Sequence, residues 1–185
     1  MRHTLERENS TNIRQGHQEA YKKIICEHYS PIYRFAVYLS GDAGLAEDLT
    51  QETFTSAWAN ISHYDGRASL GTWLHRIAYH KFIDSQRSRE RRAGLEAGLK
   101  EGSADARTNP NPLHQLAKDE HIRLLYEAMH KLDSPEYVAI VLHYVQGFSF
   151  REMTGVLDEP VGTIKWRTSQ ALKKLRAFLT GRIES

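Results

Sequence analysis

The sequence has only one cysteine, Cys26, which excludes an intrachain disulfide and a metal site built on paired cysteines. It also lacks any apolar run close to the roughly 18 residues that a membrane-spanning helix needs, so we expect no membrane insertion. The first eight residues lack the apolar core of a secretory signal. Segments that alternate strictly between apolar and polar residues, which would indicate β-strands, are missing too. These absences favour an all-α protein of the cytoplasm.

Charge of one sign is missing from two segments. Residues 41–60 contain four acidic residues and no Lys or Arg, whereas residues 163–182 contain six basic residues and no acidic one. A further basic cluster lies in mid-chain and consists of Arg87, Arg89, Arg91 and Arg92. The small net charge of +2 conceals this segregation. Clusters of opposite sign favour one surface for nucleic acid and another for a second partner. The alternative is that each cluster is only a solvated face.

Apolar residues recur at three- and four-residue steps in two parts of the chain, which predicts two small helical domains. The stretch between these parts is rich in Gly and Pro and poor in large apolar residues, a composition that is typical of a flexible linker. We therefore divide the chain into a flexible N-terminus (1–16), a first domain (17–92), a linker (93–115), a second domain (116–180) and a tail (181–185).

The first domain is expected to contain three helical segments. In the first of them Pro31 predicts either a kink or two abutting helices. Asp42 is a candidate N-cap for the second, on which Leu49, Phe54 and Trp58 are expected to pack inward. The third is a long helix whose distal end is almost entirely charged. The predicted helices cover residues 18–39, 45–61 and 70–91, and a loop covers residues 62–69.

The second domain ends in a helix-turn-helix pattern. Ser149 and Glu152 are spaced as a capping box at the start of a short helix, and a basic helix follows the turn at residues 158–160. Two short amphipathic helices of this kind, with the second one basic, are typical of a DNA-binding helix-turn-helix. Ser134 and Pro135 are expected to cap and begin an earlier helix. The predicted helices cover residues 116–132, 135–145, 150–157 and 161–179.

The last of these helices has an apolar and a polar face. We expect the apolar face to pack inward, and it consists of Val161, Ile164, Thr168, Ala171, Leu172 and Leu175. The polar face mixes side chains that contact phosphates with side chains that read base edges, so we predict that it contacts DNA. It consists of Thr163, Lys165, Trp166, Arg167, Ser169, Gln170 and Lys173. The alternative is a basic solvated helix whose Trp166 packs on a neighbouring helix.

Both domains carry motifs that resemble the sigma-70 family of bacterial RNA polymerase sigma factors. In the second domain, FSFREM at residues 148–153 and EPVGTIKWR at residues 159–167 resemble region 4 of the extracytoplasmic-function subgroup. In the first domain, AEDLTQETF at residues 46–54 and TWLHRIA at residues 72–78 are similar to region 2. The resemblance covers roughly residues 17–178. It implies a factor that binds core polymerase and directs transcription initiation, without catalysis of its own.

The resemblance also implies a role for each surface. The resemblance implies that the chain contacts the beta-prime clamp helices and the beta flap of the polymerase. On the acidic helix, the residues implied to bind polymerase are Glu47, Asp48, Gln51 and Glu52. The loop at residues 62–69 would hold an unpaired base of the minus-10 element, and the next helix would follow the strand, which needs stacking rings and cations. The implied minus-10 residues are His63, Tyr64, Arg67, Arg76, Tyr79, His80, Lys81 and Arg87. The polar face of the last helix would read the minus-35 element.

The chain departs from the family pattern in both domains. His80 stands where Asn is common, and Trp166 replaces a small residue. Ser169 and Gln170 replace a frequent aromatic–Arg pair, and Gly155 places a helix-weakening residue in the middle of the short helix. The minus-35 sequence of the family therefore cannot be carried over to this chain.

Two rival functions remain open from the sequence. A stand-alone helix-turn-helix regulator explains the second domain but leaves the acidic helix unassigned. The 10 histidines invite a metal-dependent hydrolase, yet His75 and His80, like His114 and His121, lack the i,i+4 spacing of a helical zinc site, and no HExxH occurs. We therefore expect no metal and no cofactor. An anti-sigma factor is an expected partner because such partners are common in the family.

Overall fold

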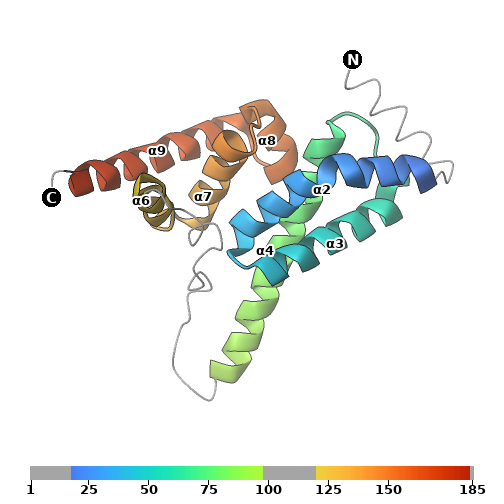
Figure 1. The fold of residues 1–185 in the computed structure, drawn as a ribbon, viewed down its shortest axis with the longest axis horizontal. Coiled ribbons are helices and arrows are strands. Elements are labelled where there is room, and N and C mark those ends of the chain that lie inside the picture. The colour runs from blue at the N-terminus through green and yellow to red at the C-terminus, as the bar shows by residue number, and fades with distance from the viewer. Residues whose placement is uncertain (1–17, 98–119, 184–185) are drawn as a thin grey trace. The chain divides into compact units, whose positions relative to one another are not determined.

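The computed structural model describes residues 18–97 and 120–183 (Figure 1). In these two ranges every regular element is a helix, which confirms the predicted all-α fold. The chain divides into two compact units, of which the first contains residues 18–97 and the second residues 120–183. The first runs from blue to green in Figure 1 and the second from yellow to red. Most of the predicted linker and residues 116–119 lie outside the described residues.

The first unit is a packing of three helices. They are α2 (Gln18–Ser40), α3 (Ala43–Asn60) and α4 (Leu70–Ala97), with a 3₁₀ turn, η1 (Ile61–His63), after α3. Each of the three packs against the other two. Side chains that all three contribute are almost completely buried between them, among them Ile24, Ile32, Phe35, Leu49, Leu70 and Leu74. Because burying one such side chain contributes about 1.5–3 kcal/mol, this core holds the three helices in a fixed arrangement.

The turn between α2 and α3 depends on Gly41 and Asp42. Gly41 has a φ of +66°, a left-handed conformation that glycine adopts without steric strain. Asp42 is the N-cap of α3, as predicted, and its carboxylate accepts a hydrogen bond of 2.7 Å from the backbone N–H of Leu45. A cap of this kind contributes about 1 kcal/mol. It fixes the residue at which the acidic helix begins.

In the first unit, α2 decides between the two predicted alternatives and α4 extends past its predicted end. α2 is a single helix with Pro31 inside it, so the alternative of two abutting helices is wrong. A proline interrupts only locally, and the next turn is anchored by Ile32 and Phe35, which are completely buried. α4 continues to Ala97, past the predicted end near Arg91. The Arg and Glu residues of its distal part favour helix strongly enough to extend it through Gly94.

The second unit is built around its last helix. Its elements are α6 (Glu120–Met129), α7 (Ser134–Ile140), a π-helical turn η2 (Val141–Val145), α8 (Phe150–Leu157) and α9 (Val161–Ile183). α9 packs against α6, α7 and α8. The side chains at the centre of this packing are completely buried, namely Val141, Leu142, Met153, Val156 and Ile164.

The capping residues of the second unit are partly those predicted. Ser149 caps α8 in a capping box with Glu152 as expected, with the Ser149 backbone N–H donating to the carboxylate at 2.8 Å. The N-cap of α7 is Asp133 and not Ser134. The Asp133 backbone N–H donates to the Glu136 carboxylate at 3.1 Å, so the capping box lies one residue earlier than the Ser-Pro pair suggested. Pro135 still occupies the first turn, where its missing N–H is harmless.

Three residues that were expected to pack inward are exposed, namely Trp58, Val161 and Leu172, at 42%, 43% and 41%. On α9 the buried stripe is narrower than the predicted apolar face and consists of Ile164, Thr168, Ala171 and Leu175. At 3.6 residues per turn, Val161 and Leu172 lie at the margin of this stripe. Trp58 lies away from the buried side of α3, and its ring packs on that of Tyr21 with centroids 4.5 Å apart.

Candidate protein and nucleic-acid interfaces

α3 presents an acidic face to solvent, which we define as Glu47, Asp48, Gln51 and Glu52. All four side chains are exposed, and they lie on the side of α3 opposite its buried residues. Behind them, Leu49 and Phe54 are buried as predicted. Three carboxylates are thus carried on a helix whose other side is fixed in a core. Such an arrangement suits a partner surface rich in Arg, because charge-assisted hydrogen bonds are strongest between groups held in place.

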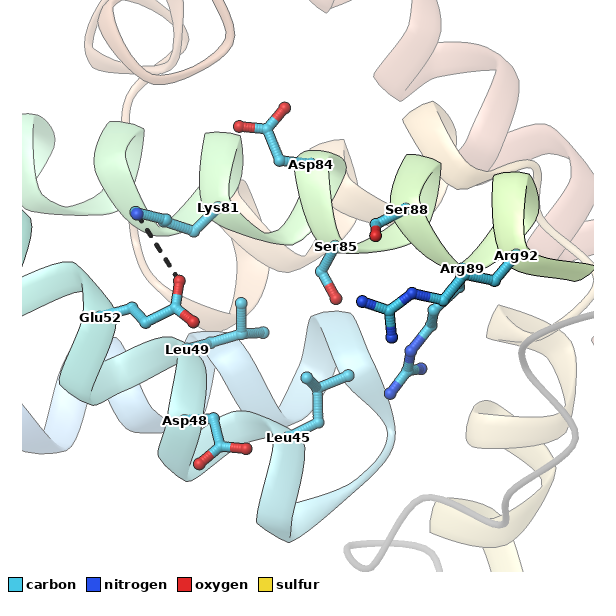
Figure 2. Close-up of a pocket in the computed structure, with 10 residues that line it drawn as sticks. All are labelled: Leu45, Asp48, Leu49, Glu52, Lys81, Asp84, Ser85, Ser88, Arg89 and Arg92. Atoms are coloured by element: carbon cyan, nitrogen blue, oxygen red, sulfur yellow. Dashed lines mark ion pairs between the residues drawn. The ribbon is translucent and has the colours of Figure 1, made fainter.

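A groove of about 310 Å³ lies between α3 and α4 (Figure 2). Glu52 of the acidic face lines one side, and Lys81 of α4 lies across from it, with its ammonium 3.6 Å from the carboxylate. Arg89 and Arg92 line the same groove from α4. One residue predicted to contact the minus-10 strand, Lys81, therefore points toward α3 and forms an ion pair with a residue predicted to bind polymerase (Figure 2).

The loop after η1 is held by its own tyrosine. Tyr64 is only 4% exposed, its hydroxyl donates to the carbonyl of Ala68 at 2.7 Å, and its ring lies 5.2 Å from that of Trp73. Two other predicted minus-10 residues of this segment, His63 and Arg67, are exposed. The Tyr64 ring therefore supports the loop from within. It is not part of the exposed surface of the loop, on which a base would stack.

Three of the predicted minus-10 residues share one side of α4, and we call them the α4 stripe: Arg76, His80 and Arg87. All three are exposed, and their spacings of four and seven residues align them along the helix. Tyr79 is half-buried beside them, and its ring lies 5.9 Å from that of His80. Cations and rings in a row on a rigid helix suit the phosphates and bases of a single strand.

The mid-chain basic cluster is divided between two sides of α4. All four arginines are exposed. Arg87 and Arg91 lie one turn apart, and the Arg91 Nε donates to the Arg87 carbonyl at 3.2 Å. Arg89 and Arg92 line the groove toward α3. Only half of the cluster therefore continues the α4 stripe, while the other half faces the acidic helix.

α8 and α9 form the predicted helix-turn-helix. α8 ends at Asp158, whose φ of +55° is left-handed, a conformation that aspartate tolerates better than most residues. Its backbone N–H donates to the Thr154 carbonyl at 3.1 Å, and the Pro160 carbonyl accepts from the Ile164 N–H at 3.2 Å as α9 begins. The turn between the helices is thus fixed by backbone hydrogen bonds at both ends.

The predicted DNA-reading surface of α9, which we call the recognition face, keeps its seven residues: Thr163, Lys165, Trp166, Arg167, Ser169, Gln170 and Lys173. Five of them are exposed, while Gln170 and Arg167 are partly buried. Trp166 is 63% exposed, so the alternative in which it packs on a neighbouring helix is wrong. Lys165 places its ammonium 5.9 Å from the centre of the Phe150 ring on α8.

Arg167 is bound within its own unit. Its guanidinium donates two hydrogen bonds to the carboxylate of Glu159, of 2.5 and 3.0 Å. The Arg167 side chain is only 17% exposed. Two-point Arg–carboxylate pairs are strong and geometrically specific. Because Glu159 lies in the turn before α9, this pair ties the turn to the second turn of the helix.

Three carboxylate contacts of the second unit were not predicted from the sequence. Glu159 pairs with Arg167 across a turn, and Lys174 pairs with Glu136 at 2.8 Å and with Asp133 at 3.1 Å. The hydrogen bond that the Lys174 ammonium donates to the Glu136 carboxylate raises the pKa of Lys174. None of these contacts has the i,i+3 or i,i+4 spacing that makes a helical ion pair visible in a sequence. The only signal for Glu159 was an acid placed directly before the turn proline of a basic helix.

Two further absences can be stated for residues 18–97 and 120–183. No group of three or more His, Cys, Asp and Glu side chains there is arranged to hold a metal ion. No helix in these ranges combines the length and the apolar content that are needed to cross a membrane.

Comparison with protein families matches both units. The family described as Sigma-70 region 2 matches residues 24–92, and the family described as Sigma-70, region 4 matches residues 122–175. The first match contains the acidic face and the α4 stripe, and the second contains the recognition face. Because both regions are present and in this order, the stand-alone helix-turn-helix regulator no longer fits the chain.

Individual relatives agree with this assignment. The chain is 33% identical to the ECF RNA polymerase sigma factor SigE of Mycolicibacterium smegmatis, over 89% of this chain and 63% of that protein. It is 30% identical to the ECF RNA polymerase sigma factor SigW of Bacillus subtilis, over 90% of this chain and 92% of that protein. Among solved structures, the chain resembles the sigma factor RpoE of Bartonella quintana, which was solved in complex with the anti-sigma factor NepR. The two chains superpose with a TM-score of 0.70 and share 26% sequence identity, and the match covers 86% of this chain and 96% of that one. The chain therefore belongs to the extracytoplasmic-function (ECF) sigma factors of the sigma-70 family.

Proposed function

We propose that this alternative sigma factor binds core RNA polymerase through the acidic face of α3, and that its partner there is the clamp helices of the beta-prime subunit. The single observation that supports this most strongly is the rigid exposure of Glu47, Asp48 and Gln51 on a helix whose opposite side is buried. Family membership supplies the identity of the partner, and the carboxylates supply the chemistry for its basic side chains. Further polymerase contacts to the beta flap are part of the same proposal.

The α4 stripe and the loop before it form the proposed minus-10 surface. His63 and Arg67 of the loop are exposed, and the stripe continues from Arg76 along α4. Base stacking contributes roughly 1–3 kcal/mol per base, so holding one or two bases can offset local unpairing. In this proposal Tyr64 supports the surface from within the loop. Lys81 lies in the groove between α4 and α3.

The recognition face of α9 forms the proposed minus-35 surface. A helix-turn-helix places the exposed side of its second helix in the major groove, and the exposed side of α9 carries Trp166, Ser169 and Lys173. Arg167 contributes by holding the turn to α9 through Glu159. We further propose that the chain has no enzymatic activity, since a factor of this family acts by binding alone.

We also propose that an anti-sigma protein regulates this factor. The solved sigma factor RpoE, which shares 26% identity and a TM-score of 0.70 with this chain, was crystallised with an anti-sigma factor. The acidic face of α3 is the part of the surface that such a protein would have to block to prevent polymerase binding.

The test of the polymerase surface is the reversal of one charge. Asp48→Arg should weaken binding to purified core RNA polymerase by at least about tenfold, because it places a cation against a basic partner surface, where like charges cost several kcal/mol. Affinity can be measured by titrating labelled protein with core enzyme. The matched control is Glu27→Arg, which reverses another exposed acid, on α2.

Two outcomes decide the assignment. Loss of core binding in Asp48→Arg together with normal binding in Glu27→Arg supports the acidic face as the polymerase surface. Equal binding by both variants would place that surface elsewhere. In either case wild-type protein and core enzyme should start transcription at defined promoters, which tests the function itself independently of the surface.

A further inference from the structure

Trp166 lies at the centre of the outward side of α9. The buried stripe of this helix consists of Ile164, Thr168, Ala171 and Leu175. At 3.6 residues per turn, Trp166 projects to the side opposite this stripe. With 63% of its surface exposed, it is the most exposed of the large apolar side chains of the described helices. Nothing in the packing of the second unit accounts for an indole in this place.

The neighbours of Trp166 on this side are polar and mostly uncharged. Thr163 precedes it by three residues and Gln170 follows it by four, so both adjoin it on the helix surface. Two cations at one edge of α9 are bound inside the unit, Arg167 by Glu159 and Lys174 by Glu136. The centre of the face is therefore an indole beside a hydroxyl and an amide, with Lys173 one further turn along.

The major groove offers one apolar group, the C5-methyl of thymine. The indole has a large apolar surface and a single N–H, which can donate a hydrogen bond but not accept one. Thymine matches both properties, because it displays its methyl group next to the O4 acceptor. Cytosine displays an amino donor in the same place and has no methyl group. An indole at this position therefore discriminates between the two pyrimidines.

From this geometry we infer that Trp166 reads a thymine of the minus-35 element through its methyl group. The inference rests on the proposed function of the recognition face and adds the identity of a base to it. Gln170, one turn further along, has the amide that pairs in two-point fashion with adenine. The recognition face thus suits a base-pair step that contains A·T, and Trp166 is the residue that determines its specificity for thymine.

The test removes the methyl group and nothing else. Full-length protein is assembled with core RNA polymerase, and the promoter is first mapped by transcription of genomic DNA with the wild-type holoenzyme. Each thymine of the minus-35 element, on either strand, is then replaced in turn by deoxyuridine. Wild-type holoenzyme should bind one of these duplexes about fourfold more weakly in a titration, which is the effect expected for one buried methyl-sized group.

Variants of the protein assign that effect to the indole. Trp166→Ala should bind the original duplex more weakly and should bind the thymine and deoxyuridine duplexes equally well. Trp166→Phe keeps an apolar ring and should keep part of the methyl discrimination. The matched control is Leu172→Ala, which removes another exposed apolar side chain from the same helix, away from the centre of the face. It should discriminate as the wild type does.

The outcomes separate this inference from the function on which it rests. The inference is overturned if no thymine of the element can lose its methyl group with an effect on the wild type, or if Trp166→Ala retains the discrimination. In both cases correct start sites with the wild-type holoenzyme would leave the proposed function standing. If the wild-type protein and core polymerase produce no defined start sites, the proposed function itself fails.

Discussion

The helices α3 and α9 each have one buried and one exposed side, but they differ in how many of their exposed charges are paired within their own unit. Each helix is buried on one side and polar on the other. On α3, Glu52 is the one member of the acidic face with an ion pair recorded in the described part of the chain. On α9, Arg167 and Lys174 are both bound to carboxylates of their own unit. A count of charges in the sequence therefore overstates how many cations α9 offers to a partner, and this places more of the proposed DNA specificity on Trp166 and Gln170.

Each unit has a core of its own, and the largest expected effect is the loss of stability when one of these cores is truncated. Leu74 is completely buried in the first unit, and Leu74→Ala should reduce the free energy of unfolding of that unit by about 2–5 kcal/mol. Amide hydrogen exchange should report faster exchange in α2, α3 and α4 only. The mirror control is Leu142→Ala, whose side chain is completely buried in the second unit. Loss of protection in both units from either substitution would mean that they unfold as one.

The second expected effect concerns the ion pair between Arg167 of α9 and Glu159 of the same unit. Glu159→Ala should destabilise the second unit by about 1–3 kcal/mol, because it leaves the partly buried Arg167 guanidinium without this carboxylate. Binding to the minus-35 element should also lose selectivity, since the turn is no longer tied to the helix. Thermal unfolding and binding to matched and mismatched promoters measure the two effects.

Two further variants separate the positioning role of Arg167 from a direct contact with DNA. Exchanging the two residues, in Glu159→Arg with Arg167→Glu, should restore part of the stability and selectivity if the pair acts by positioning. Selectivity that stays as low as in Arg167→Ala alone would instead indicate that the guanidinium reads DNA itself.

Much of the fold follows from local patterns in the sequence. The caps at Asp42 and Ser149, the acidic side of α3 and the buried stripe of α9 all depend on residues within four positions of one another, where periodicity and capping rules apply. The extension of α4 to Ala97, past the predicted end near Arg91, does not follow from composition, because the segment after Arg92 has the Gly-rich composition of a linker although the charged residues before Gly94 favour helix formation.

The contacts that side chains at the candidate sites make within their own unit could not be predicted from such local patterns. Tyr64, Lys81 and Arg167 have side chains suited to nucleic acid, yet each contacts another part of its own unit. Those contacts join residues from different elements or across a turn, and helix periodicity carries no information about them. A residue type shows what a side chain is able to contact, whereas its burial decides which contact is available.

The smallest expected effect concerns pH and again contrasts the two units. The Tyr21 hydroxyl donates to the Phe54 carbonyl, and burial raises the pKa of Tyr21 from 10.0 to about 12. Between pH 10 and about 12 the unfolded chain loses this proton before the folded one does, so the first unit should become less stable as the pH rises through this window. Urea unfolding followed by tryptophan fluorescence, with Trp58 and Trp73 in this unit, measures the change.

Tyr21→Phe tests whether this loss belongs to one side chain. The variant should start about 1 kcal/mol less stable at pH 8, because it lacks the hydrogen bond to Phe54, and should then lose less stability between pH 10 and pH 12. The matched control is Lys174→Met in the second unit. The carboxylates of Glu136 and Asp133 raise the pKa of Lys174 above 10.5, so its stabilisation is present at neutral pH and is lost only as the pH rises past that value. If Lys174→Met altered the loss of stability of the first unit at alkaline pH as much as Tyr21→Phe does, the two units would be energetically coupled, and α3 and α9 would not belong to independent units.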